Sequence, residues 1–171
     1  MSKSGVAESS THVRAFVALG ANLDDPQVTV TAALQSLRAL PQSTVVAASS
    51  LYRSAPVGLK NQPDFINAVV AIDTTLTAHE LLNELFAIEA RFGRRRDYHH
   101  APRTLDLDLL LYGDAVNVDP QLTLPHPRMH ERAFVLMPLV EIEPDCVVPY
   151  YGRAADLLAH CGDQRLAKLA R

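Results

Sequence analysis

Hydrophobic residues along the chain fall into short apolar runs separated by segments with helical spacing. Residues 15–20 (AFVALG) form a short run that a glycine stops, and residues 65–74 (FINAVVAIDT) form a longer one, so both predict buried strands. Residues 43–54 (STVVAASSLYRS) predict one further strand between them. Residues 55–64 (APVGLKNQPD) are rich in Pro, Gly and Asn and predict a loop.

Two segments have hydrophobic residues at the spacing of an amphipathic helix. The first begins at Asp25, a candidate N-cap, has Pro26 in its first turn, and ends before a proline. The second covers about residues 78–92, where Thr77 and Glu80 match a capping box and a glycine follows the last apolar residue. These signals predict one helix after the first strand and one after the third.

The order of the predicted elements is β-α-β-β-α-β, followed by an apolar segment and a last short helix at residues 152–161. This order predicts an α+β fold with a ferredoxin-like βαββαβ core, in which a mainly antiparallel sheet is flanked by helices, plus C-terminal additions. Residues 1–13 are small and polar and predict a disordered tail. We therefore expect residues 14–171 to form a single domain.

The composition limits the class of protein. A chain of 171 residues with 48% hydrophobic and 20% charged residues is typical of a globular domain. The net charge of -3 argues against binding nucleic acid over the whole surface. Two cysteines make no disulfide framework, and no apolar run approaches the roughly 18 residues that span a bilayer. We therefore expect a cytoplasmic protein without nucleic-acid or membrane partners.

Residues 102–114 (PRTLDLDLLLYGD) predict a strand that carries two carboxylates on a ladder of leucines. Because side chains alternate between faces, one face of the strand would carry Asp106, Asp108, Leu110 and Tyr112. The other, buried face would carry Leu105, Leu107, Leu109 and Leu111. Carboxylates this close repel unless a cation joins them, and Mg²⁺ binds carboxylates together with substrate phosphates. An amphipathic edge strand with a solvated acidic face is the alternative, and the motif alone favours it.

A basic segment (GRRRDYHHAPR) lies just before this strand. Arg91 and Arg94 suit a helix C-terminus, which is the simpler explanation for them, but Arg103 lies three residues before Asp106. Arginines beside a carboxylate pair recur in phosphoryl transfer, where they neutralise developing charge. The phosphate loop GxxxxGK[ST] and the GxGxxG fingerprint are absent, so metal and arginine would have to bind any phosphate.

A flat polar pocket is predicted around Asn67, which interrupts an apolar strand and shares a face with Phe65. A buried amide can bind a ring that carries a donor and an acceptor, and it can equally bond the backbone of a neighbouring loop. Ser54 and the loop after it precede this strand, and Phe134 lies far downstream. Aromatic faces and one amide would suit a flat heterocycle.

Residues 99–110 (HHAPRTLDLDLL) resemble the signature of the 6-hydroxymethyl-7,8-dihydropterin pyrophosphokinase family. That signature runs basic residue, any residue, Gly or Ala, small residue, Arg, two residues, Asp, aliphatic, Asp, two aliphatics. Further segments follow in the family's order: ALGANL, SSLYRSAPVG, QPDFINAVV, ELLNELFAIEARFGR and LPHPRMHERAFVLMPLVEIEPD. The chain departs from the pattern at His100, where many members carry Trp.

The resemblance implies transfer of pyrophosphate from ATP to the pterin's 6-hydroxymethyl group, with release of AMP. It also implies that two Mg²⁺ ions serve as cofactors. By resemblance, Asp106 and Asp108 would hold the metals, and these two residues with Arg94 and Arg103 would be catalytic. ATP would contact Glu89, Arg94, Arg96, Arg103, His126 and Arg132. The pterin would contact Ser54, Ala55, Val57, Phe65, Asn67 and Phe134. The partners would be these two small molecules, and we expect a monomer.

Two other functions stay open on the sequence. A different metal-dependent transferase, for nucleotidyl or glycosyl groups, would also use an Asp-x-Asp pair and a basic segment, but it leaves the pocket residues unexplained. A ferredoxin-like binding module, for RNA for example, would bind in a salt-sensitive way without Mg²⁺. The aromatic content of 6% argues against it, because sheets that bind RNA carry stacking aromatics.

Overall fold

A six-stranded antiparallel sheet forms the centre of the molecule, for which a computed structural model describes residues 11–56, 61–93 and 104–170. Its strands are β1 (Val13–Ala21), β2 (Ser43–Ala48), β3 (Tyr52–Ser54), β4 (Phe65–Thr74), β5 (Asp106–Tyr112) and β10 (Leu166–Lys168). Their order is β10-β3-β4-β1-β5, and β2 also pairs with β4. Without β10, this is the order of a ferredoxin-like sheet, so the predicted α+β fold is confirmed.

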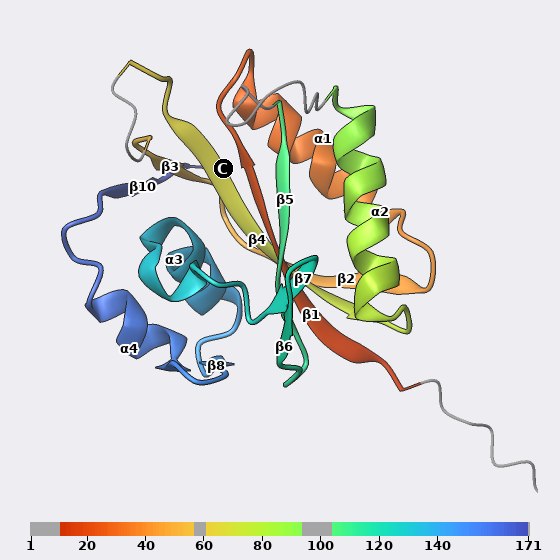
Figure 1. Cartoon of the computed structure of the whole chain (residues 1–171). Helices are drawn as coiled ribbons and strands as arrows, with labels where there is room; N and C mark the ends of the chain where they lie inside the picture. The colour runs from red at the N-terminus through yellow and green to blue at the C-terminus, as the bar shows by residue number, and fades with distance from the viewer. Residues whose placement is uncertain (1–10, 57–60, 94–103, 171) are drawn as a thin grey trace, which may run out of the picture.

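Helices cover both faces of the sheet (Figure 1). On one side lie α1 (Pro26–Arg38) and α2 (Ala78–Arg91), and on the other α3 (Ala133–Ile142) and α4 (Ala154–Ala159). Short additions complete the chain: the hairpin of β6 (Asn117–Asp119) and β7 (Leu122–Leu124), the hairpin of β8 (Val147–Val148) and β9 (Gly152–Arg153), and a 3₁₀ turn at Met129–Glu131. None of the described helices is long and apolar enough to cross a membrane.

Strand alternation divides the core into two parts, one on each face of the sheet. On the first face, Val17 of β1 packs in a cluster with Leu85 of α2. On the second face, Phe16 of β1 and Val69 of β4 pack with Leu136 of α3. Burying each such leucine contributes about 1.5–3 kcal/mol. The two helix layers are therefore held to the sheet by side chains that alternate along the same strands.

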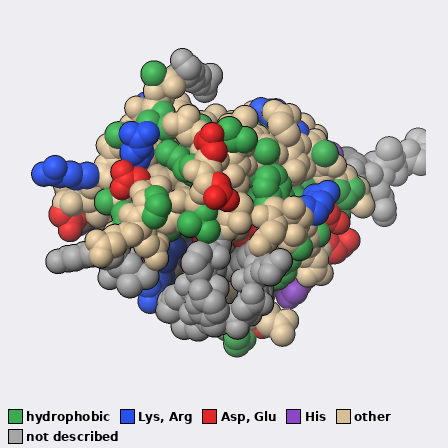
Figure 2. Space-filling model, turned by 90° about the horizontal axis from the view of Figure 1, so that it is seen from above, with side chains coloured by type: hydrophobic (Ala, Val, Ile, Leu, Met, Phe, Trp, Pro, Cys, Tyr) green, Lys and Arg blue, Asp and Glu red, His purple; other side chains and the backbone are tan. Residues whose placement is uncertain are grey.

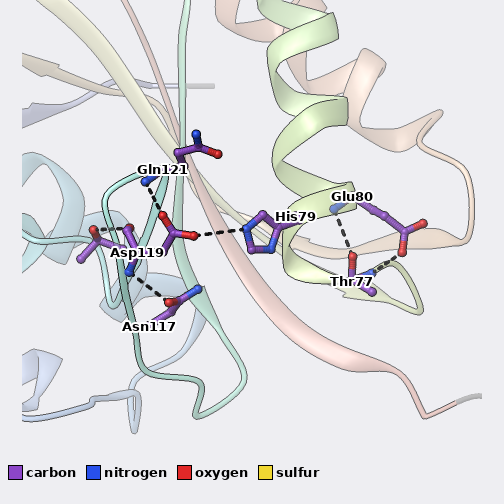
Figure 3. A network of polar contacts seen from close by, with 7 residues as sticks. Thr77, His79, Glu80, Asn117, Asp119 and Gln121 are labelled. Atoms are coloured by element: carbon purple, nitrogen blue, oxygen red, sulfur yellow. Dashed lines mark hydrogen bonds and ion pairs between the residues drawn. The ribbon is translucent and has the colours of Figure 1, made fainter.

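Both predicted helix starts are confirmed by their caps. The Asp25 carboxylate accepts a hydrogen bond from the backbone N–H of Val28 at 3.4 Å. The Thr77 hydroxyl accepts from the N–H of Glu80, and the Glu80 carboxylate accepts from the N–H of Thr77, each at 3.1 Å (Figure 3). Such reciprocal bonds satisfy two N–H groups that a helix start leaves without partners.

The single strand predicted at residues 43–54 is wrong, because the structure divides it into β2 and β3. Three residues, 49–51, stand opposite the two residues 68 and 69 of β4, so the ladder cannot continue through them. One backbone bond remains, from the Ser49 N–H to the Val69 carbonyl at 2.9 Å, and side chains supply the others. The Ser49 hydroxyl accepts from the N–H of Val69 at 2.9 Å, and the Ser50 N–H donates to the Glu141 carboxylate at 2.9 Å. β3 thereby leaves the line of β2 and reaches the site described below.

Two further details differ from the sequence prediction. Gly20 does not stop the first strand, because β1 continues to Ala21. In β5 the register with β1 shifts at Leu110, where a bulge reverses the alternation of side chains. Leu111 therefore packs in the second core, and Tyr112 packs against the first, its hydroxyl donating to a backbone carbonyl of residue 76 at 2.6 Å. The faces predicted for these two residues are wrong, whereas those predicted before the bulge are confirmed.

Candidate active site

A cavity of about 220 Å³ opens on the second face of the sheet, beside the start of α3. Its floor and one wall come from the sheet, which contributes four predicted site residues: Phe65, Asn67, Asp106 and Asp108. The end of β3, a strand of the same sheet, contributes Ser54 and Ala55, and the start of α3 forms the opposite wall with Arg132 and Phe134. Figure 2 views the end of the sheet where β5 begins and shows acidic side chains among hydrophobic ones, with basic side chains on either side.

One row of residues crosses three strands at the floor of this cavity. Gly20 of β1 is paired with Asp106 of β5 on one side and with Asn67 of β4 on the other. Neighbouring strands are about 4.8 Å apart, so the backbones of Asp106 and Asn67 are about 10 Å apart. Paired residues share a face, and Gly20 has no side chain to fill the gap. In the next row Ala18, another small residue, pairs with Asp108.

The side chain of Asn67 is fixed by two hydrogen bonds. Its Nδ2 donates to the Ser54 hydroxyl at 2.8 Å and to the Tyr52 carbonyl at 3.3 Å, and the residue is only 4% exposed. These bonds use both amide hydrogens, so Oδ1 points the other way, toward Gly20 and the cavity. The amide therefore bonds the neighbouring strand β3 and leaves its oxygen toward the cavity. Its predicted contact with a flat ring stays a prediction.

Asp106 and Asp108 are half-buried and line the cavity from the same face of β5. Within residues 11–56, 61–93 and 104–170, no group of three or more His, Cys, Asp or Glu side chains is placed to hold a metal ion. A carboxylate pair fits Mg²⁺, which keeps waters and commonly binds one or two carboxylates plus substrate phosphates. The donor set at this cavity therefore fits a magnesium site that a phosphate substrate completes.

Glu89 holds the strand that carries this carboxylate pair. It is 1% exposed on α2, and its Oε2 accepts a hydrogen bond from the backbone N–H of Leu107 at 3.0 Å. Leu107 lies between the two aspartates on the sheet's outer strand, so its N–H points away from β1. Glu89 does not line the cavity, and its predicted contact with ATP stays a prediction.

His126 lies next to the carboxylate pair, although it does not line the cavity. The backbone N–H of His126 donates to the carbonyl of Leu110 at 2.9 Å, and the ring Nδ1 accepts from the backbone N–H of Arg128 at 3.2 Å. An accepting Nδ1 places the proton of a neutral imidazole on Nε2. Burial lowers the pKa of His126 below its ordinary value; the charge of Asp108 opposes this, and those of Arg132 and Arg128 add to it.

Arg132 and Phe134 stand together at the start of α3. The guanidinium carbon of Arg132 lies 5.5 Å from the centre of the Phe134 ring, a cation–π distance. Arg132 is the N-cap residue of the helix, and both side chains line the cavity. A cation and an aromatic face are thus presented side by side opposite the sheet.

Part of the predicted site lies outside the described residues. This part comprises Val57, Arg94, Arg96 and Arg103, together with the family-pattern positions His99 and His100. Their predicted roles stay predictions. Conversely, four lining residues were not predicted from the sequence: Ala18, Leu19, Gly20 and Val135. A glycine inside a strand often marks a close approach to a ligand, and this signal could have identified Gly20.

Comparisons with known proteins agree on a single protein family. The family described as 7,8-dihydro-6-hydroxymethylpterin-pyrophosphokinase (HPPK) matches residues 16–144. The "2-amino-4-hydroxy-6-hydroxymethyldihydropteridine pyrophosphokinase" of Pseudomonas aeruginosa is 45% identical over 156 residues, which cover 91% of this chain and 96% of that protein. The protein of the same name from Haemophilus influenzae is 42% identical over 157 residues, covering 92% and 98%.

A solved structure shares the fold. The crystal structure of Plasmodium falciparum HPPK-DHPS wild type with pteroate superposes with a TM-score of 0.70 at 14% identity. The match covers 87% of this chain and 42% of that chain, so this chain spans less than half of that protein's length. On the family match and the two bacterial relatives, this chain belongs to the 7,8-dihydro-6-hydroxymethylpterin-pyrophosphokinase family.

Proposed function

We propose that this protein is an ATP-dependent diphosphotransferase that transfers pyrophosphate from ATP to 6-hydroxymethyl-7,8-dihydropterin and releases AMP, a step of folate biosynthesis. Its membership of the family supports this reaction. The observation that carries the proposal for this cavity is the pairing of Gly20 with both Asp106 and Asn67. Because of this pairing, the floor of the cavity has the Asp106 carboxylate at one edge, where metal and phosphate would bind. The Asn67 amide lies at the other edge, where a heterocycle would bind.

The amide edge suits the pterin. The ring carries hydrogen-bond donors, and Asn67 Oδ1 is an acceptor whose direction is fixed by the two bonds of Nδ2. Phe65 and Phe134 lie on opposite walls and offer apolar faces to a flat ring. Ser54 and Ala55 close the same end of the cavity, and Val57 follows them in the sequence. This end of the cavity would hold the pterin with its hydroxymethyl group toward the aspartates.

The carboxylate edge suits ATP. Asp106 and Asp108 would hold two Mg²⁺ ions, which when bound neutralise the triphosphate and polarise its phosphorus–oxygen bonds. Arg132 lines the same cavity and adds a fixed positive charge for phosphate oxygens. His126, whose protonated Nε2 is a donor, stands close enough to Asp108 for their charges to interact. Arg94, Arg96 and Arg103 would add further cations.

In the proposed reaction the pterin hydroxyl oxygen forms a bond to the β-phosphorus of ATP, and the bond from that phosphorus to the α–β bridging oxygen breaks. AMP leaves with the bridging oxygen, and the hydroxyl proton is released. The chain contributes mainly by holding the two substrates in line, an effect that can supply several kcal/mol of the roughly 8–23 kcal/mol by which enzymes lower barriers. The charges opposite the phosphates supply electrostatic stabilisation.

The test is AMP formation from ATP and Mg²⁺ with and without the reduced pterin. We expect AMP that depends on the pterin and disappears when a chelator removes Mg²⁺. Asp106→Asn and Asp108→Asn should each reduce the rate by at least about 100-fold, because each removes a metal-binding charge. Asp114→Asn, on the turn after β5, is the matched control and should keep the wild-type rate.

The same assay separates the alternatives. A nucleotidyltransferase would release pyrophosphate from ATP instead of AMP, and a glycosyltransferase would turn over neither substrate. A binding module would give no product, and its binding would be independent of Mg²⁺. Absence of pterin-dependent AMP from the folded wild-type protein would contradict the proposed function.

A further inference from the structure

The first turn of α3 is capped by a residue that is distant in the sequence. Arg132 is the N-cap residue, and its side chain makes no capping hydrogen bond. The amide of Gln164 replaces that cap: its Oε1 accepts from the N–H of Ala133 at 2.8 Å, and its Nε2 donates to the carbonyl of Glu131 at 2.7 Å. One side chain therefore holds the backbone immediately before and immediately after Arg132.

The segment that carries Gln164 is tied to the opposite wall of the cavity. Its own N–H donates to the carbonyl of Cys161 at 3.0 Å. Two residues later the chain enters β10, where Leu166 pairs with Ser54 of β3. Gln164 also lines a second cavity, of about 320 Å³, which shares Ser54, Ala55 and Phe134 with the first. The C-terminal segment thus fixes the distance between the start of α3 and the strand that carries Ser54.

Because the N-cap residue of α3 is an arginine that makes no capping hydrogen bond, another residue must cap the helix. Ser, Thr, Asp or Asn at this position would satisfy the first N–H groups of the helix locally, which typically stabilises by about 1 kcal/mol. The chain has Arg132 there, and its guanidinium lines the cavity beside Phe134. A residue that points into the cavity cannot also bond the helix start, so the cap and the cation come from two residues.

We propose that Gln164 is a positioning residue for the phosphate-binding end of the cavity: by bonding the backbone on both sides of Arg132, it sets where that guanidinium stands relative to Asp106 and Asp108. The proposal rests on the proposed function, because it takes the ligand of Arg132 to be the triphosphate of ATP. A helix cap with a purely structural role would stabilise α3 and leave the kinetic constants unchanged.

Two substitutions separate these roles. Gln164→Ala removes both bonds, and we expect kcat/KM for ATP to fall by about 10- to 100-fold, the effect of a small misplacement of a substrate-holding group. Gln164→Glu keeps an acceptor for the N–H of Ala133 and adds a negative charge at a helix N-terminus, which favours the helix. It loses the donor to the Glu131 carbonyl, and because residue 164 is exposed, the new oxygen can turn toward water instead of opposing that carbonyl. We therefore expect little change in melting temperature together with a fall in kcat/KM for ATP.

Three measurements make the test specific. The KM for the pterin should change less than the KM for ATP in both variants, whereas general loosening of the fold would change both. Combined with Arg132→Ala, Gln164→Ala should add less than about twofold, because residues that act through one another are not additive. Gln35→Ala, an exposed glutamine on α1, is the matched control and should behave as wild type.

The outcomes distinguish failure of this inference from failure of the proposed function. If the wild-type protein forms pterin-dependent AMP and both Gln164 variants keep its kcat/KM for ATP, the positioning role is wrong and the proposed function stands. Fully additive effects of Gln164→Ala and Arg132→Ala would also overturn it. If the wild-type protein forms no such AMP, the proposed function fails first.

Discussion

Asp106 and Asn67 lie on either side of Gly20 in a single row of paired residues that crosses β5, β1 and β4. The row places the backbones that carry a carboxylate and an amide about 10 Å apart, with no side chain between them at Gly20. Neither side chain could reach a shared ligand if a bulky residue stood between them. The arrangement therefore makes the central glycine as important to the site as the two polar residues.

Filling the floor of the cavity should abolish substrate binding without unfolding the sheet. Gly20→Leu places a branched side chain between the two polar edges, and we expect the KM for the pterin to rise by at least about 100-fold. Gly20→Ala is the matched control: its Cβ would lie 3.5 Å from Asn67 Oδ1, an ordinary contact. It should keep most activity, since alanine also suits a strand interior better than glycine.

Titration calorimetry with the pterin and thermal unfolding of the same samples check this prediction. Gly20→Leu should lose the binding signal while its melting temperature stays close to that of the wild type. Wild-type affinity in Gly20→Leu would place the ligand somewhere other than this floor.

Reversing the polarity of the amide should weaken the pterin site specifically. Asn67→Asp keeps the shape of the side chain but replaces Nδ2 by an oxygen that faces the Tyr52 carbonyl. Two buried acceptors then oppose one another, which should cost about 1–3 kcal/mol of unfolding free energy. We expect the KM for the pterin to rise by about tenfold or more and the KM for ATP to change little.

Steady-state kinetics with each substrate varied in turn measures this difference, and urea unfolding measures the stability. Asn83→Asp, an exposed asparagine on α2, serves as the control and should leave both constants unchanged. Equal increases in both KM values for Asn67→Asp would show that the amide supports the fold rather than the pterin.

The carboxylate of Glu141 should make stability depend on pH. It accepts hydrogen bonds from the N–H of Ser50 at 2.9 Å, from the Ser50 hydroxyl at 3.0 Å and from the hydroxyl of Tyr52. Burial acts to raise the pKa of Glu141, but the bonds from Tyr52 and Ser50 outweigh it and hold this pKa below its ordinary value. A lowered pKa means that the ionised group stabilises the fold above the pKa of the unfolded chain.

This stabilisation should be lost as the pH falls below about 4.3, the ordinary glutamate pKa, and then through the lower pKa of the folded state. Glu141→Gln should therefore lower the melting temperature at pH 7, and its difference from the wild type should shrink on acidification. Melting curves at several pH values check this. A difference between Glu141→Gln and the wild type that stays constant with pH would contradict the account.

The parts of the fold that local sequence determines could be predicted. The capping box of Thr77 and Glu80 needs residues three apart, and the helical stripe after it needs only 3.6-residue spacing. The faces of Asp106 and Asp108 follow from the two-residue period of a strand. Local rules were sufficient there because the partners of each residue lie within a few positions in the chain.

Features that depend on distant partners could not be predicted. The break between β2 and β3 is stabilised by Val69 and Glu141, which lie 20 and 91 residues from their serine partners. The bulge at Leu110 arises from the register with β1, which no single segment encodes. The cap of α3 comes from Gln164, 31 residues after Ala133. In each case the sequence specifies the residues, and only the assembled sheet brings them together.

The most direct test of the central claim follows the phosphates of ATP into the product. ATP labelled at the β-phosphate and ATP labelled at the γ-phosphate are incubated separately with the wild-type protein, Mg²⁺ and 6-hydroxymethyl-7,8-dihydropterin. The account predicts that both labels appear in the pterin product, in equal amounts, and that the AMP is unlabelled. Transfer of the γ-label alone, with labelled ADP from the β-labelled substrate, would contradict it.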